Sequence, residues 1–440
     1  MTTAVHFGTF GAERHWRPHD LAELPRLALS GADPVVGRMD EMLFGFTSPG
    51  DLLVTRSALT APHREAIATA GFDFEYRCLP PLAADGDEAA PMDEPAVEGL
   101  LAQDQELVRA MARHERVLPF AVVPATQRLL TDMGRSSLVP PAETVARVNG
   151  KAWSTALAQR LGLPGAGDIV CSAAELEAAV TRTLAVGNHA ALVKDAYGVA
   201  GQGTVEVVTP RACARLVRHV RRQEERGRRV RFVVQPRHAR RADFSGHLRV
   251  GRDGSWDHLG LQGMTNDGYR HHASGPPTPG VTRAAERGEY TAVLDEVAKA
   301  LVAEGYFGPV GVDSMLTESG GWVPLLEVNA RSSLGLLSLR LDRRAAGHGL
   351  SAHLWQSDVS VEPGAGVDGL LRALSEEGLL YAEGTGAGVL PLVGGSLRTA
   401  SGRLFCAAFC APEQFPLLRA RTLACAGRAG IHAKRGGVPA

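Results

Sequence analysis

The chain has 440 residues, of which 45% are hydrophobic and 22% charged, and its formal net charge at pH 7 is -1. This length exceeds the usual limit for one hydrophobic core, so two or three domains are expected. The near-zero charge disfavours a nucleic-acid-binding protein, and no apolar stretch reaches the length of a membrane span. Six scattered cysteines and an N-terminus without a signal-peptide pattern predict a cytoplasmic protein.

The first regular pattern lies in residues 51–80, where two apolar runs flank a helical segment. A strand, a helix and a second strand in this order indicate a Rossmann-like βαβ unit. No GxGxxG sequence follows the first strand, so we interpret this unit as a scaffold or substrate wall rather than a dinucleotide site. Residues 82–98 are acidic and rich in alanine and proline, which predicts an exposed linker.

Helical patterning returns after this linker. Helices are predicted over residues 100–116 and 126–133, with an extended run over 117–123 between them. A Pro-Pro pair at 140–141 then marks the boundary of a new unit. That unit opens with an amphipathic helix that begins at Lys151.

A glycine-rich turn that carries a lysine follows the next predicted helix, residues 172–185. An apolar run over 190–193 leads into Lys194, and the turn ends where a second apolar run begins, at 204–208. Backbone amides of such a turn can close on phosphate oxygens while the ammonium neutralises their charge. The turn contains three glycines, Gly198, Gly201 and Gly203. The alternative interpretation is a long hairpin loop whose glycines serve only turn geometry.

The basic segment over residues 215–232 is interpreted as a solvated helix face rather than a nucleic-acid contact, because valines and glutamates are spaced among its arginines. A hairpin is predicted around residues 251–254, and residues 266–280 are predicted to form a flexible loop over a site. Polar residues of interest in this region are Gln235 and His238 at the end of one strand, and His247 and Arg249 on one face of the next.

Two short apolar runs over residues 310–316 and 322–328 are separated by a polar turn, which predicts a β-hairpin. Each run carries one carboxylate, and a cross-strand pair would bring Asp313 beside Glu327 and Asn329. Two carboxylates and an amide oxygen are hard ligands that suit Mg²⁺ held against phosphates. The alternative is that each is an ordinary polar residue at a strand end. Beyond the hairpin, the sequence predicts a helix over residues 367–377 and then two strands and a helix without a catalytic constellation.

Taken together, Lys151, Lys194 with its glycine loop, and Asp313 followed by Glu327-Val328-Asn329-Ala330-Arg331 resemble, in order and spacing, the ATP-grasp superfamily of carboxylate-amine ligases. The resemblance implies an α/β and α+β multidomain fold. Its expected parts are a Rossmann-like pre-ATP-grasp domain (1–145), an ATP-grasp domain (146–345) and a small C-terminal α+β lobe (346–440). The order of lobes is most similar to the pheganomycin-type peptide ligases.

The resemblance also implies roles for individual residues. ATP would be held by Lys151, Lys194, Gly198, Gly201, Gly203, Gln235 and His238. Mg²⁺ would be bound by Asp313, Glu327 and Asn329. The transferred phosphoryl group would be faced by Arg331, Arg249 and Lys194. Two positions depart from the family's pattern, because Gln235 stands where many members have Glu and Asp195 where Pro is frequent.

These features predict an ATP-dependent ligase that forms an amide or peptide bond through an acyl phosphate and releases ADP and phosphate. Its expected partners are a small-molecule carboxylate and an amine, such as an amino acid or peptide, in natural-product biosynthesis. We expect no nucleic-acid or membrane partner, and a homodimer is allowed. Two alternatives stay open, a small-molecule kinase of the same fold and a nucleotide-binding regulatory module without turnover. The candidates for a general base are His247, Asp267, His271 and His272.

Overall fold

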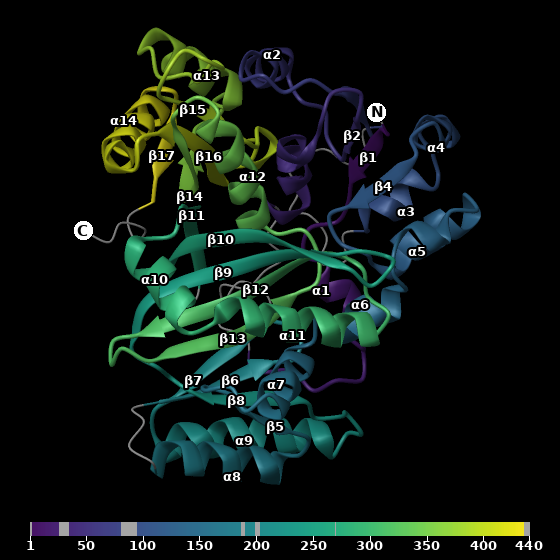
Figure 1. The fold of residues 1–440 in the computed structure, drawn as a ribbon, viewed down its shortest axis with the longest axis vertical. Coiled ribbons are helices and arrows are strands. Elements are labelled where there is room, and N and C mark those ends of the chain that lie inside the picture. Colours follow the sequence, from purple (N-terminus) through teal and green to yellow (C-terminus); the bar gives the residue numbers. More distant parts are fainter. Residues whose placement is uncertain are drawn as a thin grey trace.

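The computed structural model describes residues 2–25, 35–80, 95–185, 190–198, 203–268 and 270–434. In this part of the chain the strands form three sheets of four, nine and four strands. Figure 1 shows the nine-stranded sheet, here called the large sheet, in the middle of the molecule. The four-stranded sheet of residues 168–236, the small sheet, lies below it, and the N-terminal unit, residues up to 148, lies above and to one side. Over the same ranges, no helix combines the length and apolarity that crossing a membrane requires.

The N-terminal sheet is parallel and has the order β3-β2-β1-β4. Its strands are β1 (Ala4–Phe7), β2 (Leu52–Thr55), β3 (Glu75–Cys78) and β4 (Arg116–Pro119). The helical segments around it are α1 (Glu13–Trp16), η1 (Val36–Phe46), α2 (Ala61–Thr69), α3 (Val97–Leu101), α4 (Gln105–Ala112), α5 (Pro124–Asp132), η2 (Ser136–Leu138) and α6 (Ala142–Val148). The parallel β2-α2-β3 unit is the βαβ unit that the sequence predicts for residues 51–80.

The single helix expected over residues 100–116 is instead two short helices. Asp104 interrupts it, because its carboxylate accepts the N–H groups of Glu106 and Leu107 and so caps the start of α4. The extended run expected over 117–123 keeps its strand pairing only as far as Pro119. A proline and an N-cap therefore divide this region more finely than its hydrophobic periodicity suggests.

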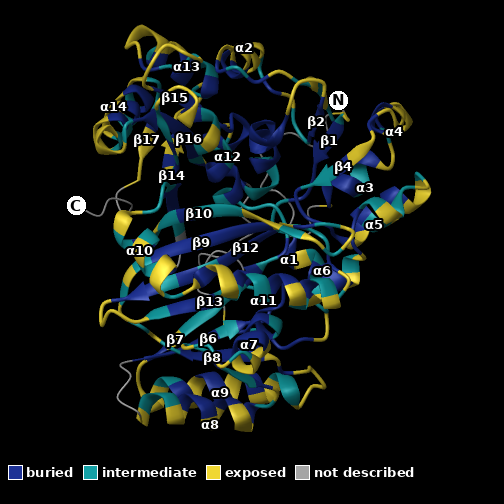
Figure 2. Cartoon of the chain, in the orientation of Figure 1, coloured by how far each residue is buried: buried dark blue, intermediate teal, exposed yellow. Residues whose placement is uncertain are grey.

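The small sheet is antiparallel and has the order β5-β8-β6-β7. Its elements are α7 (Lys151–Arg160), β5 (Asp168–Val170), α8 (Ala173–Ala185), β6 (Ala191–Asp195), β7 (Thr204–Val207), α9 (Pro210–Glu224) and β8 (Phe232–Pro236). Helices α8 and α9 pack on one face and enclose a separate apolar core, which includes Val193 and Val217. Figure 2 shows the outer surfaces of these two helices exposed, so the basic residues of α9 lie on a solvated face.

The large sheet has the order β13-β12-β9-β10-β11-β14-β16-β15, with β17 paired to β14. Its strands are β9 (Arg240–Val250), β10 (Trp256–Asp267), β11 (Arg270–Gly275), β12 (Gly308–Thr317), β13 (Trp322–Asn329), β14 (Ser351–Val361), β15 (Gly388–Pro391), β16 (Ser401–Cys410) and β17 (Ile431–Ala433). One face carries α10 (Pro279–Arg287) and α11 (Tyr290–Ala303), since Tyr290 of α11 lies against Gly246. The opposite face carries α12 (Leu334–Ala346), since Gly335 lies against His247.

The prediction of a flexible loop over residues 266–280 is wrong for most of that segment. Strand β10 continues to Asp267, and Arg270–Gly275 forms β11, which pairs with β10 and β14. The register between β10 and β11 shifts between Thr265 and Asn266. Such a bulge breaks the alternation by which a strand is recognised in a sequence, and this explains why the segment reads as a loop.

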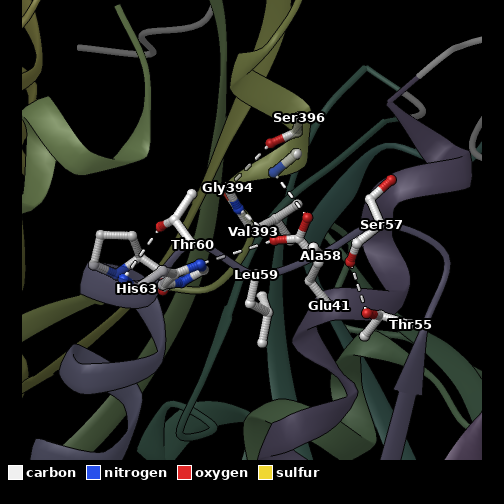
Figure 3. Close-up of polar contacts among 12 residues, drawn as sticks. Glu41, Thr55, Ser57, Ala58, Leu59, Thr60, His63, Val393, Gly394 and Ser396 are labelled. Carbon is white, nitrogen blue, oxygen red and sulfur yellow. Dashed lines mark hydrogen bonds and ion pairs between the residues drawn. The ribbon is translucent and has the colours of Figure 1, made fainter. Parts of the chain in front are cut away.

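The C-terminal segment continues the large sheet through β14 to β17, and it also includes α13 (Val367–Glu376), η3 (Gly395–Leu397), η4 (Pro412–Gln414) and α14 (Phe415–Arg428). It docks on the N-terminal unit through Glu41, whose carboxylate accepts the N–H groups of Gly394 (2.6 Å) and Gly395 (2.9 Å). His63 Nε2 lies 2.9 Å from the carbonyl oxygen of Pro391. Figure 3 shows the other nitrogen of the ring, Nδ1, directed at the carboxylate of Glu41, 3.9 Å away. Two segments more than 300 residues apart in sequence are thus joined by buried polar contacts.

Candidate functional site

The carboxylate hairpin predicted from the sequence is formed by β12 and β13. Asp313 lies directly opposite Glu327, and Asn329 lies opposite Gly311, so the three polar side chains share one face of the large sheet. The amide of Asn329 donates to Asp313 Oδ2 over 3.0 Å. The structure therefore brings together the three side chains that the sequence proposed as metal ligands.

The electrostatics of the Asp313–Glu327 pair suit a cation. Burial, and then repulsion by Glu327, raise the pKa of Asp313 to about 7, while Arg331 and the Asn329 amide oppose that rise. In the described ranges, no group of three or more His, Cys, Asp or Glu residues is arranged to hold a metal ion. A divalent ion here would consequently rely on the two carboxylates and the amide oxygen, a donor set of the kind that Mg²⁺ accepts.

Lys151 connects this pair to the glycine-rich loop. Its Nζ lies 2.6 Å from Glu327 Oε1 and donates to the carbonyl oxygen of Gly198 over 2.8 Å. Lys151 is the first residue of α7, and its backbone N–H donates to the carbonyl of Ala196. The first residue of one helix thus contacts both the loop and a metal-ligand candidate.

Lys194 faces the pair from the small sheet. It alternates along β6 with Val193, which packs in the core beneath α8 and α9, so the lysine points to the opposite side. Burial lowers its pKa to about 8, Glu327 and Asp313 act to raise the pKa, and Lys151 lowers it further. These influences show that the ammonium lies within electrostatic reach of both carboxylates and of Lys151.

The loop after Lys194 is described at its two ends only. The N–H of Asp195 donates to the carbonyl of Gly203, which has a φ of +89° and lies so close to Gly198 that a Cβ on it would be 3.1 Å from the Gly198 Cα. Gly201 lies outside the described residues. The Asp195 carboxylate accepts the N–H of Tyr197 and contacts Arg17 over 3.0 Å, so Asp195 anchors the start of the loop to the N-terminal unit.

Gln235 in β8 and His238, two residues beyond that strand, lie near Lys194. Gln235 is buried and pairs with Leu192, which puts it on the face of the small sheet that carries Lys194. Burial, and then the charge of Lys194, lower the pKa of His238. The Nε2 atom of His238 is buried and has no hydrogen-bond partner in the described part of the chain, which fits a polar contact supplied by a ligand.

Arg331 is clamped by the N-terminal unit. Its Nη2 donates to Glu13 Oε1 over 2.7 Å, its Nη1 donates to the carbonyl of Ser332, and its guanidinium lies 5.5 Å from the ring centre of Phe120. Its Nε is buried and has no partner in the described ranges. Glu13 could not be predicted from the sequence, because it is 318 positions from Arg331 and belongs to no motif.

Arg249 lies apart from this group. It is on the same face of the sheet but four residues along β9 from Ser245, the partner of Asp313, which corresponds to about 13 Å along the strand. Its charged neighbours are Arg116 and Asp257. The structure therefore does not bring Arg249 together with the carboxylate pair as it does Lys151, Lys194 and Arg331.

Of the three histidine candidates for a general base, His247 and His272 are buried and His271 is half-buried. His247 lies 2.9 Å from Ser245 Oγ, and His271 lies 2.7 Å from Ser274 Oγ. Burial lowers the pKa of each histidine to about 4. His272 contacts Arg419, and the side chain of Asp267 lies outside the described residues. The structure selects none of these groups as a base.

Comparisons with known proteins locate the chain by its fold. No protein-family model and no curated protein sequence matches it. The biotin carboxylase domain of Hydrogenobacter thermophilus 2-oxoglutarate carboxylase superposes with a TM-score of 0.57 at 12% identity, covering 98% of this chain and 91% of that one. N5-carboxyaminoimidazole synthetase from Staphylococcus aureus superposes with a TM-score of 0.53 at 10% identity, covering 96% of this chain and 97% of that one.

A third structure gives the same result. Biotin carboxylase from Campylobacter jejuni superposes with a TM-score of 0.54 at 10% identity, covering 98% of this chain and 92% of that one. Nearly the whole length of both chains is matched in each comparison, so the likeness includes the N-terminal unit and the C-terminal strands as well as the two central sheets. At these identities the likeness establishes architecture, and the chain has the multidomain ATP-grasp fold of those enzymes.

Proposed function

We propose that this protein is an ATP-dependent carboxylate-amine ligase that releases ADP and phosphate. The observation that carries the proposal is the approach of Lys194, from the small sheet, to the Asp313–Glu327 pair on the large sheet. A cation on one sheet that faces a carboxylate pair on another can bind the phosphates of a nucleotide, while the carboxylates hold a divalent ion. The structural neighbours support this choice, because one was solved with MgADP and another with ADP and 5-aminoimidazole ribonucleotide.

Residues of this chain would divide the work of the first step. Lys151 and Lys194 would bind the phosphates of ATP, and Gln235 and His238 would contact its adenosine end. Asp313, Glu327 and Asn329 would hold Mg²⁺, which neutralises phosphate charge when bound. The substrate carboxylate attacks the γ-phosphorus, a P–O bond to ADP breaks, and an acyl phosphate forms while Arg331 balances charge on the transferred group.

The second step forms the amide. The amine nitrogen attacks the acyl carbon, the C–N bond forms, and the C–O bond to phosphate breaks. The nitrogen loses a proton and inorganic phosphate leaves. Phosphorylation is needed because an unactivated carboxylate would have to expel oxide. The buried Nε of Arg331 is suited to donate to an oxygen of the acyl phosphate, since it has no other partner in the described chain.

At a finer level, we propose that the acid and amine are amino acids or peptides in natural-product biosynthesis. This rests on the resemblance of the lobe order to the pheganomycin-type peptide ligases. The solved neighbours include complexes with bicarbonate and with 5-aminoimidazole ribonucleotide, so the fold accommodates small acids and small amines of several kinds.

Incubation with ATP, Mg²⁺, an amino-acid panel and hydroxylamine tests the proposal. Hydroxylamine traps an acyl phosphate as a hydroxamate, so the ligase predicts acid-dependent ADP release with a hydroxamate visible by mass spectrometry. ADP release with a phosphorylated acceptor and no hydroxamate would identify a kinase instead. Tight ATP binding without turnover on any acid would identify a regulatory module.

A further inference from the structure

Three arginines from distant parts of the chain, on β4, β9 and α12, lie within electrostatic reach of one another. Arg116 is the first residue of β4 and lies opposite Ala4 of β1, whose N–H donates to Asp51 over 2.7 Å. The guanidinium of Arg340, on α12, lies 5.8 Å from the ring centre of Phe46 in η1. Burial lowers the pKa of His6 in β1 most, and Arg340 and Arg116 both act to lower it further, so both arginines lie within electrostatic reach of the same strand.

The third arginine, Arg249, approaches from the large sheet. Helix α12 lies over β10, because Leu339 is against Gly260 and the guanidinium of Arg343 donates to the carbonyl of Leu259. Two residues before Leu259, Asp257 pairs with Arg249. Burial lowers the pKa of Arg340 most, and the charges of Arg249 and Arg116 lower it further. This is expected for guanidinium groups within electrostatic reach of one another.

Two carboxylates compensate this positive charge only in part. Asp257 lies opposite Arg249, and Asp51 lies within electrostatic reach of Arg340. The oxygens of Asp51 also accept the N–H groups of Ala4 and Ser48 and contact His6 Nε2 over 3.1 Å. In the described part of the chain, the guanidinium groups of Arg116, Arg249 and Arg340 make no ion pair. Arg116 and Arg249 are exposed and Arg340 is half-buried, so a ligand can reach all three from solvent.

Gathering like charges costs free energy unless an opposite charge joins them. We propose that Arg116, Arg249 and Arg340 form a binding site for a phosphate group carried by a small molecule, separate from the nucleotide site. The planar forks of several guanidinium groups fit the oxygens of a phosphate better than single ammonium groups do. The site is distinct because Arg116 is the first residue of β4, whereas Phe120, over whose ring Arg331 lies, follows the last residue of that strand.

The experiment is calorimetric titration of the full chain with inorganic phosphate at constant ionic strength. The nucleotide site is first saturated with Mg²⁺ and a non-hydrolysable ATP analogue, so that Lys151 and Lys194 cannot account for binding. The proteins compared are the wild type, Arg116→Gln, Arg340→Gln and, as a matched control on the exposed face of α9, Arg218→Gln. Arg116→Gln alters an exposed side chain and stays informative if Arg340→Gln does not fold.

The proposal predicts one phosphate site in the nucleotide-saturated wild type, with affinity reduced at least about tenfold in Arg116→Gln and Arg340→Gln and unchanged in Arg218→Gln. Loss of phosphate binding when the analogue is added would assign the anion to the nucleotide site and overturn the proposal. Equal affinity in all four proteins would overturn it too. Failure of the analogue to bind would count against the proposed ligase while leaving the phosphate titration interpretable.

Discussion

The ammonium of Lys151 lies 2.6 Å from Glu327 Oε1 and so joins the start of α7 to the second strand of the carboxylate hairpin. The same ammonium reaches the carbonyl of Gly198, which belongs to the loop that follows Lys194. One side chain therefore links the two sheets between which the nucleotide is proposed to bind. Lys151 is thus the residue that the loop, the helix and the candidate metal site have in common.

We predict that Glu327→Gln reduces ADP formation at least about a hundredfold, because the substitution removes a negative charge that would hold Mg²⁺ and leaves the side-chain volume intact. The measurement is ADP release, with thermal unfolding to verify that the variant is folded. Glu318→Gln, at the exposed turn of the same hairpin, is the matched control and should retain turnover. Equal loss in both variants would show that the hairpin, and not the carboxylate, is responsible.

The pH dependence of nucleotide binding tests the assignment of Lys194. Its pKa of about 8 means that the free protein carries this charge below that pH and loses it above. We therefore predict that affinity for Mg·ADP falls from about pH 8 upward by as much as about tenfold per pH unit. Lys194→Arg keeps its charge and should show no such fall; a fall of the same size in both proteins would place the titrating group elsewhere.

The ion pair between Glu13 and Arg331 provides a test of coupling between the N-terminal unit and the candidate functional site. We predict that Glu13→Gln and Arg331→Gln each lower turnover at least about tenfold while nucleotide affinity stays within about twofold, because the pair orients a group that acts on the transferred phosphoryl. The double variant should lose little more than either single variant. Additive losses would mean that Glu13 and Arg331 act independently.

The burial of Glu41 beside Gly394 (Figure 3) makes stability depend on pH, although the N–H groups of Gly394 and Gly395 act to lower the pKa that burial raises. Burial raises the pKa of Glu41 to about 7, so the folded protein retains a proton that the unfolded chain releases. This contribution is present at low pH and is lost as pH rises from the ordinary carboxyl range to about 7. Asp40, whose pKa burial also raises to about 7, contributes in the same direction.

We predict that Glu41→Gln removes part of this dependence. The free energy of unfolding of the variant, relative to the wild type, should increase by a few kcal/mol between about pH 4.5 and about pH 7, since one pKa unit corresponds to about 1.4 kcal/mol. Denaturant unfolding across this range measures it. Glu65→Gln, an exposed position on α2, should parallel the wild type, and a parallel curve for Glu41→Gln would contradict the assignment.

The parts of the site that could be predicted from the sequence are those encoded by short segments. Asp313 and Glu327 occupy one hairpin, so alternation and a polar turn are enough to place them opposite each other. Lys194 likewise leaves its strand into a glycine-rich turn. In each case the relevant neighbours are within about twenty residues, and the strand pattern alone fixes the direction of the side chain.

The remaining features depend on contacts between distant segments. Arg17 reaches Asp195 across 178 positions, and no local pattern pairs the two residues. The neighbours of Arg249 come from β4 and α12, so its position among arginines was not visible in its own strand. Strand β11 was hidden by a register shift. Contacts between distant segments and bulges leave no periodic pattern in the sequence, so neither can be predicted from it.

The most direct test of the central claim is electron paramagnetic resonance of Mn²⁺, which replaces Mg²⁺ in oxygen-rich sites. In the presence of a non-hydrolysable ATP analogue, the wild type should bind Mn²⁺ tightly. Asp313→Asn and Glu327→Gln should each weaken Mn²⁺ binding by at least about tenfold. If both variants bound Mn²⁺ and the analogue as tightly as the wild type, the divalent ion would not lie at this hairpin and the account would be contradicted.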